Sequence, residues 1–127
     1  MRYVRLTNAT RSVVLSDNCG VADNFVTRVR GLLGRTSLRE GEGLFITPCP
    51  SIHMFGMKFA LDVIFVTPEN VVTDWVENIL PGKVYVAKAH CGKPQSAIEL
   101  PVGTIPRSGT QYGDQLVCED IDGSTTR

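Results

Sequence analysis

The residues that could carry chemistry gather in one apolar stretch, Cys49–Val66, which reads CPSIHMFGMKFALDVIFV. It contains a histidine (His53), two methionines, a lysine (Lys58) and a carboxylate (Asp62) among aliphatic and aromatic side chains. An ordinary core strand has no use for these polar groups, because burying them without partners costs free energy. This stretch is therefore where we expect a ligand-binding or catalytic site.

Asp62 is the most informative of these residues, because it lies inside the run Leu61–Val66, where both faces of the predicted strand are apolar. A buried carboxylate has to be hydrogen-bonded or paired with a cation. Asp62 either holds backbone amides or a cation such as Lys58, or it serves in a pocket as a functional group. Glu99 poses the same question in a second apolar run, and two such carboxylates could act as an acid and a base.

The histidines and cysteines also have more than one interpretation. His53 is a general base, a metal ligand together with Cys49, or a histidine whose ring nitrogens are simply hydrogen-bonded. The pairs Cys49/His53 and His90/Cys91 supply the four ligands of a zinc site, but their spacing fits no zinc motif. We therefore expect no metal and no cofactor.

Methionines and arginines complete the set of candidate groups. Met54 and Met57 are possible soft ligands for Cu(I), although packing in an apolar core explains them more simply. Four arginines in the first third of the chain form either an anion-binding patch or a solvated helix face; they are Arg28, Arg30, Arg35 and Arg39.

A framework of short strands has to position these side chains. Runs of β-branched and aromatic residues alternate with turn signals at intervals of roughly 8–12 residues. This pattern predicts a mainly β fold, a sandwich-like structure or a partly closed barrel of about seven to nine short strands. The segment 16–20 reads as a loop after a strand at 12–15, and residues 101–114, rich in Gly, Pro and Ser, also read as loop.

One amphipathic α-helix is predicted over about residues 21–33. Apolar side chains recur there at helical spacing, at Phe25, Val29, Leu32 and Leu33. Gly34 is the expected residue after the helix end. Residues 1–120 are predicted to form a single β-rich domain and residues 121–127 a frayed tail.

Composition narrows the classes of function. The formal net charge is zero, which argues against a dedicated nucleic-acid-binding protein. Residues 1–60 contain eight Lys/Arg and four Asp/Glu, whereas residues 61–127 contain five Lys/Arg and nine Asp/Glu. This uneven charge is compatible with an anionic partner that binds the first half, and equally with a dipolar surface that has no partner. No apolar run is long enough for a membrane span, and the start lacks a secretory signal. We expect a cytoplasmic protein with four reduced cysteines.

Several motifs, taken in order, resemble one known family. They are RGLLGR (30–35), GLF (43–45), SIHMFGMK (51–58), LDVIFV (61–66), AIELPVGT (97–104) and GD (113–114). Over residues 20–118 the chain is similar to the bacterial and archaeal family called domain of unknown function 192. The resemblance implies a compact β-rich, sandwich-like fold with a helix that carries the RGLLGR element, and it implies no established activity.

The chain departs from the family pattern at a few positions. Gly56 stands where a bulkier residue is usual, which would open a pocket or bend the strand. Ala60 stands where many relatives have proline. The position of His53 is often aromatic in other branches, which weakens a catalytic role for this histidine.

The sequence favours a non-catalytic module that binds a small molecule or a protein. Its predicted pocket is formed by His53, Met57, Lys58, Asp62, Arg35 and Glu99. The alternative is an enzyme of hydrolase or isomerase type that uses acid/base chemistry through Asp62, Glu99 and His53, which requires the three groups in one pocket. A third possibility, a structural subunit of a complex, predicts an exposed apolar patch of several hundred Å².

Overall fold

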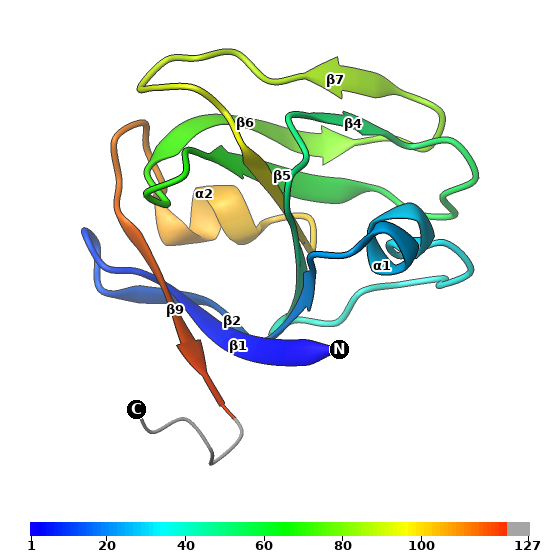
Figure 1. Ribbon diagram of the computed structural model, residues 1–127, viewed down its shortest axis with the longest axis horizontal. Coiled ribbons are helices and arrows are strands. Elements are labelled where there is room, and N and C mark those ends of the chain that lie inside the picture. Colours follow the sequence, from blue (N-terminus) through cyan, green and yellow to red (C-terminus); the bar gives the residue numbers. More distant parts are fainter. Residues whose placement is uncertain (122–127) are drawn as a thin grey trace.

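The computed structural model describes residues 1–121, apart from the side chains of Phe25 and Val29, and it consists mainly of β-strands (Figure 1). The strands in this part of the chain are β1 (Arg2–Asn8), β2 (Val13–Ala22), β3 (Glu42–Ile46), β4 (Ser51–His53), β5 (Leu61–Val66), β6 (Val72–Ile79), β7 (Val84–Val86), β8 (Ser96–Leu100) and β9 (Leu116–Asp120). The helices are α1 (Phe25–Arg30) and α2 (Thr104–Ser108).

Seven strands form one mixed sheet in the order β6-β5-β8-β3-β2-β1-β9, and β4 and β7 form a separate two-stranded sheet. Within the large sheet β2 and β3 run parallel, while the other neighbours are antiparallel. The sheet curls around α2, which lies between β5, β6 and β8 on one side and β1, β2 and β9 on the other (Figure 1). Its two edges approach through an isolated bridge between Val71 and Gln115, so the barrel is partly closed, as the sequence predicts.

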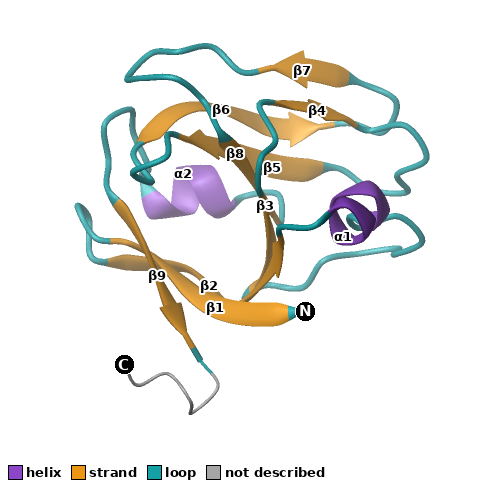
Figure 2. Ribbon diagram, in the orientation of Figure 1, coloured by secondary structure: helices purple, strands orange, loops and turns teal. Residues whose placement is uncertain are grey.

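The large sheet separates two hydrophobic cores. The inner core lies on the concave side, where Ile105 of α2 packs among side chains such as Leu6, Ile64 and Leu100. The outer core lies on the other face, beneath the two-stranded sheet and the segment that follows α1 (Figure 2). Leu32, Ile52 and Met54 cover this face and pack against strand residues that include Leu44, Val63 and Ala97. A strand at the centre of the large sheet is thus buried on both faces.

The register of the two central strands sets the positions of the two carboxylates singled out above. Asp62 of β5 pairs with Leu100 of β8, and Val63 pairs with Glu99. Because neighbouring residues of a strand point to opposite faces, Asp62 faces the inner core and Glu99 faces the outer core.

The helix predicted over residues 21–33 exists, but it is shorter. Val21 and Ala22 belong to β2, which continues through the segment expected to be a loop, because it pairs in parallel with β3. Asn24 then caps α1 through a reciprocal capping box with Thr27. The helix ends at Arg30, and the residue after its end is Gly31 and not Gly34; the positive φ of +48° at Gly31 is a conformation that favours glycine. The apolar stripe cannot be followed at Phe25 and Val29, whose side chains lie outside the described part of the chain.

A second helix forms where the sequence reads as loop. In α2, Pro106 occupies the first turn, where a missing backbone N–H is tolerated. The helix has five residues and α1 has six, so neither helix of residues 1–121 is long or apolar enough to cross a membrane. The predicted tail 121–127 lies outside the described residues, except for Ile121.

Candidate functional site

A cleft of ≈ 150 Å³ lies over the outer face of the sheet, between the end of α1 and the segment that contains β4. Its polar lining comes from Arg28 and Arg30 of α1, from Cys49, Ser51 and His53, and from Glu99 of β8. Apolar side chains form the rest, among them Leu32, Leu33, Phe55 and Met57. Three of the six residues predicted from the sequence, His53, Met57 and Glu99, therefore meet in one cleft.

Glu99 is the unusual group in this cleft. Its side chain lies among Leu44, Val63 and Ala97 on the outer face, and the residue is only 6% exposed. Among the described residues, no group donates a hydrogen bond to its carboxyl oxygens, and burial raises its pKa from the ordinary 4.5 to about 7. Within residues 1–121, every fully buried side-chain nitrogen or oxygen atom has a hydrogen-bond partner, so the oxygens of Glu99, which accept no hydrogen bond from the protein, are not fully buried and open to the cleft.

Cys49 lies beside this carboxyl group, and its Sγ donates a hydrogen bond to the Ser51 carbonyl oxygen at 3.0 Å. Burial and, next, the negative charge of Glu99 raise the pKa of the Cys49 thiol, while the nearby guanidinium of Arg28 acts in the opposite direction. A raised pKa leaves little thiolate at neutral pH. The cysteine therefore lines the cleft as a neutral thiol and is a poor nucleophile.

His53 and Met57 form part of the cleft wall. The imidazole of His53 stacks on the ring of Phe55 with a centroid distance of 5.1 Å, and both residues are exposed on the outer side of β4. Leu33 continues this apolar rim on the α1 side, with 46% of its surface exposed. The mouth of the cleft thus offers flat aromatic and aliphatic surface next to polar groups.

Asp62 does not belong to the cleft. It is 1% exposed on the inner face, where its Oδ1 accepts a hydrogen bond from Asn78 N at 2.9 Å. Its Oδ2 accepts hydrogen bonds from Gly103 N and Ile105 N, both at 3.0 Å, at the start of α2. Asp62 is therefore the residue that ties amides, and it fixes α2 to the sheet. The acid/base trio is not assembled, because Asp62 lies on the opposite face from Glu99.

The other two predicted pocket residues are also placed apart from Glu99. Lys58 is exposed and does not line the cleft. Arg35 pairs with Glu42 at 2.9 Å and borders a neighbouring cavity of ≈ 660 Å³. The segment 30–33 lines both cavities and so forms the wall between them.

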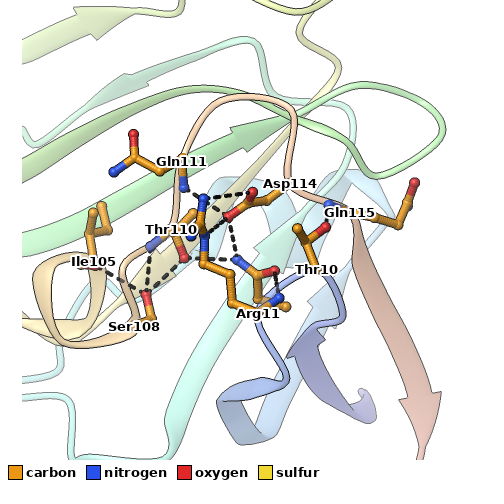
Figure 3. Close-up of polar contacts among 9 residues, drawn as sticks. Thr10, Arg11, Ile105, Ser108, Thr110, Gln111, Asp114 and Gln115 are labelled. Atoms are coloured by element: carbon orange, nitrogen blue, oxygen red, sulfur yellow. Dashed lines mark hydrogen bonds and ion pairs between the residues drawn. The ribbon is translucent and has the colours of Figure 1, made fainter.

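A buried polar network that the sequence did not indicate joins the loop after α2 to the turn between β1 and β2 (Figure 3). Asp114 accepts hydrogen bonds from Asn8 Nδ2 at 2.9 Å, Arg11 Nε at 2.6 Å and Gln111 N at 2.9 Å. Burial acts to raise the pKa of Asp114, but the hydrogen bonds from Arg11, Asn8 and Gln111 prevail and hold it below its ordinary value. The sequence signal that could have pointed to this network is the pair Gly113-Asp114, one of the motifs shared with the family.

The second histidine lies in another polar cluster. His90 stacks on Tyr112, with ring centroids 4.3 Å apart, and its Nε2 lies 3.7 Å from Asp74. Asp74 also accepts hydrogen bonds from Tyr85 Oη at 2.8 Å and Lys88 N at 2.7 Å. Within residues 1–121, no three His, Cys, Asp or Glu side chains are arranged to hold a metal ion, so the two Cys/His pairs do not form one ligand set.

The fold and the cleft define a small β-rich protein whose large curled sheet presents the carboxyl group of Glu99, which accepts no hydrogen bond from residues 1–121, to a surface cavity. Residues 6–118 match DUF192, a family described as "Uncharacterized ACR", and the chain belongs to this family.

Two relatives are each described as a UPF0127 protein. A UPF0127 protein of Thermococcus sibiricus is 34% identical over 116 residues, which cover 87% of this chain and 72% of the relative. A UPF0127 protein of Pyrococcus abyssi is 32% identical over 117 residues, covering 87% of this chain and 94% of the relative.

Two solved structures share the fold. A protein of unknown function from Novosphingobium aromaticivorans has a TM-score of 0.74 at 24% identity, covering 91% of this chain and 83% of its own. A Sinorhizobium meliloti protein, described as a putative transcription regulator, has a TM-score of 0.75 at 24% identity, covering 93% and 96%.

Proposed function

We propose that the protein is a binding module for a small polar molecule and that its site is the cleft over Glu99. The observation that carries this proposal is the carboxyl group of Glu99, which lies among apolar side chains, opens to the cleft and accepts no hydrogen bond from any group of residues 1–121. Leaving such a group without a partner costs free energy. A ligand that donates hydrogen bonds in the cleft would remove this cost.

The other buried carboxylates support this interpretation by contrast. Asp62, Asp74 and Asp114 each accept several hydrogen bonds from protein groups. The fold thus satisfies its structural carboxylates internally, and Glu99 is the exception that faces a cavity. Buried groups with strongly shifted pKa values in a cleft are candidates for a functional role.

Binding is favoured over nucleophilic catalysis by the state of the thiol in the cleft. A cysteine nucleophile requires a lowered pKa, whereas the pKa of Cys49 is raised. We further propose that the protein works in the cytoplasm, since Cys19, Cys49, Cys91 and Cys118 are all free thiols.

A thermal-shift screen against metabolites and metal ions tests the proposal. A ligand at a hundred times its dissociation constant stabilises the folded state by about 2.7 kcal/mol, which raises the melting temperature by several degrees. We expect hits on the wild type that are lost in Glu99→Gln and retained in Glu77→Gln, an exposed carboxylate on β6. Hits that shift the wild type and Glu99→Gln equally would place the binding site elsewhere and contradict the proposal.

Acid/base catalysis by Glu99 with His53 is the second candidate function. A carboxyl group with a pKa of about 7 can both release and take up a proton near neutral pH. Incubating each hit with the protein and following its mass and chirality separates the two functions. A product formed by the wild type and not by Glu99→Gln identifies an enzyme, whereas unchanged hits identify a binding module.

A further inference from the structure

The two ends of the Glu99 cleft have opposite chemistry. At the inner end, the carboxyl group of Glu99 lies among apolar side chains and has no protein donor. At the α1 end, Arg28 and Arg30 contribute two guanidinium groups. Within the described part of the chain, neither arginine forms an ion pair, although Arg2, Arg11 and Arg35 each do. Arg28 is half-buried and lines the cleft together with Cys49, and its positive charge acts to lower the pKa of that thiol.

A ligand complementary to both ends carries a cationic donor and an anionic acceptor a short distance apart. An ammonium group has three N–H donors and no acceptor, so it matches an unpartnered carboxylate. A carboxylate accepts two parallel hydrogen bonds from a guanidinium group, so it matches Arg28. A simple amine would leave the arginines unpaired, and a simple carboxylic acid would place its charge near that of Glu99.

The side chains that line the walls of the cleft indicate which kind of side chain the ligand carries. Leu33 and Phe55 lie at the rim and are 46% and 57% exposed, and Met57 is half-buried and packs against the outer core. This surface suits an aliphatic side chain. The volume of ≈ 150 Å³ admits only a small headgroup, so the side chain lies at the open mouth.

We propose that the cleft binds a free amino acid with an aliphatic side chain, its α-amino group at Glu99 and its carboxylate at Arg28. The inference rests on the proposed function and deepens it by naming the ligand class. Binding of the ammonium group stabilises the ionised form of Glu99. The charged and titratable groups that share the cleft are Arg28, Arg30, Cys49 and His53, and the arginines keep their charge throughout the neutral range.

Three matched probes test each end of the ligand separately: leucine, its decarboxylated analogue 3-methylbutylamine, and its deaminated analogue 4-methylpentanoate. Binding is read as protection of Cys49 from iodoacetamide, followed by mass spectrometry of the alkylated peptides. The exposed thiols of Cys91 and Cys118 serve as internal controls in the same molecule. We expect leucine to protect Cys49 at a concentration at least about tenfold below that of either analogue, a difference of about 1.4 kcal/mol.

Two variants assign the ends. Glu99→Gln should weaken leucine binding at least about tenfold, because the charge-assisted hydrogen bonds are lost. Arg28→Gln should make leucine and the amine bind alike, since the carboxylate then loses its partner. Arg107→Gln, an exposed arginine on α2, is the control and should leave leucine binding unchanged. The affinity of the wild type for leucine should fall below pH 7, a dependence that persists in His53→Gln and disappears in Glu99→Gln.

The possible outcomes distinguish the amino-acid inference from the broader proposal that the cleft binds a small polar molecule. Equal binding of leucine and 3-methylbutylamine by the wild type would refute the amino-acid inference, because the arginine end would contribute nothing. Protection of Cys49 by another hit of the metabolite screen, but not by leucine, would refute the inference and leave the binding function standing. Failure of every compound to protect Cys49 would overturn both.

Discussion

Replacing Glu99 by glutamine should stabilise the protein in the absence of ligand, and the gain should depend on pH. The substitution preserves the shape of the side chain and removes its charge. In the folded state burial raises the pKa of Glu99 from 4.5 to about 7. Between these two values the folded protein binds more protons than the unfolded chain, so the free energy of unfolding of the wild type falls as the pH rises through this window.

The size of the effect follows from the shift. Relative to a carboxyl group with its ordinary pKa, the raised pKa of Glu99 costs the wild type about 1 kcal/mol of stability at pH 5 and about 3 kcal/mol at pH 8. The stability difference between Glu99→Gln and the wild type should therefore grow by roughly 2 kcal/mol from pH 5 to pH 8. The cost of burying the neutral amide is the same at both pH values and cancels from this comparison.

Urea denaturation of both proteins at pH 5, 6, 7 and 8 measures the difference. Glu77→Gln, which changes an exposed carboxylate on β6, is the matched control and should show a nearly constant difference from the wild type. A difference between Glu99→Gln and the wild type that stays constant across this range would refute the reasoning. It would mean that Glu99 has a partner or contact with bulk water in solution.

Three further predictions concern the remaining buried groups. Asp62→Ala should cost about 3 kcal/mol or more in urea denaturation, because it leaves three backbone N–H groups without an acceptor; a loss below about 1 kcal/mol would show that α2 does not depend on this carboxylate. The pKa of Asp114 in the folded protein lies below its ordinary value of 3.8, so the stability that this carboxylate contributes is lost as the pH falls through the folded-state pKa. Asp114→Asn should therefore make the free energy of unfolding depend less on pH in the acidic range. An unchanged dependence in that range would contradict this role. At pH 8 iodoacetamide should alkylate Cys49 more slowly than Cys91, and the substitution Glu99→Gln should speed the reaction at Cys49. Equal alkylation rates of Cys49 in the wild type and in Glu99→Gln would show that Glu99 does not act on this thiol.

Elements with a strong local pattern were predictable from the sequence. The runs that became β5 and β6 are rich in β-branched and aromatic residues, and the strand predicted over Leu61–Val66 is confirmed. The end of β2 was not predictable in this way, because Val21 and Ala22 are held by parallel pairing with β3, more than twenty positions away in the chain. Helix α2 depends on hydrogen bonds to Asp62, which is 43 positions from Ile105, and no local pattern carries that information.

The candidate site was predictable in part for the same reason. A short apolar stretch that mixes histidine, methionine and cysteine supplies several of the residues that line the cleft. The sequence could not distinguish Asp62 from Glu99, since each is a single acid in an apolar strand. Which carboxylate finds donors depends on the register between β5 and β8 and on what covers each face of the sheet.

That register is the strongest argument for placing function at Glu99. Glu99 pairs with Val63, the residue after Asp62. The two acids are therefore offset by one residue on adjacent strands, and their side chains face different cores. On the inner face, the start of α2 and Asn78 supply three N–H groups to Asp62. On the outer face, Glu99 packs among apolar strand residues, opens to the cleft and accepts no hydrogen bond from residues 1–121, so leucine or methionine at this position would make the folded state more stable. A protein that retains an acid at such a position gives up stability there, and groups of this kind are concentrated at functional sites.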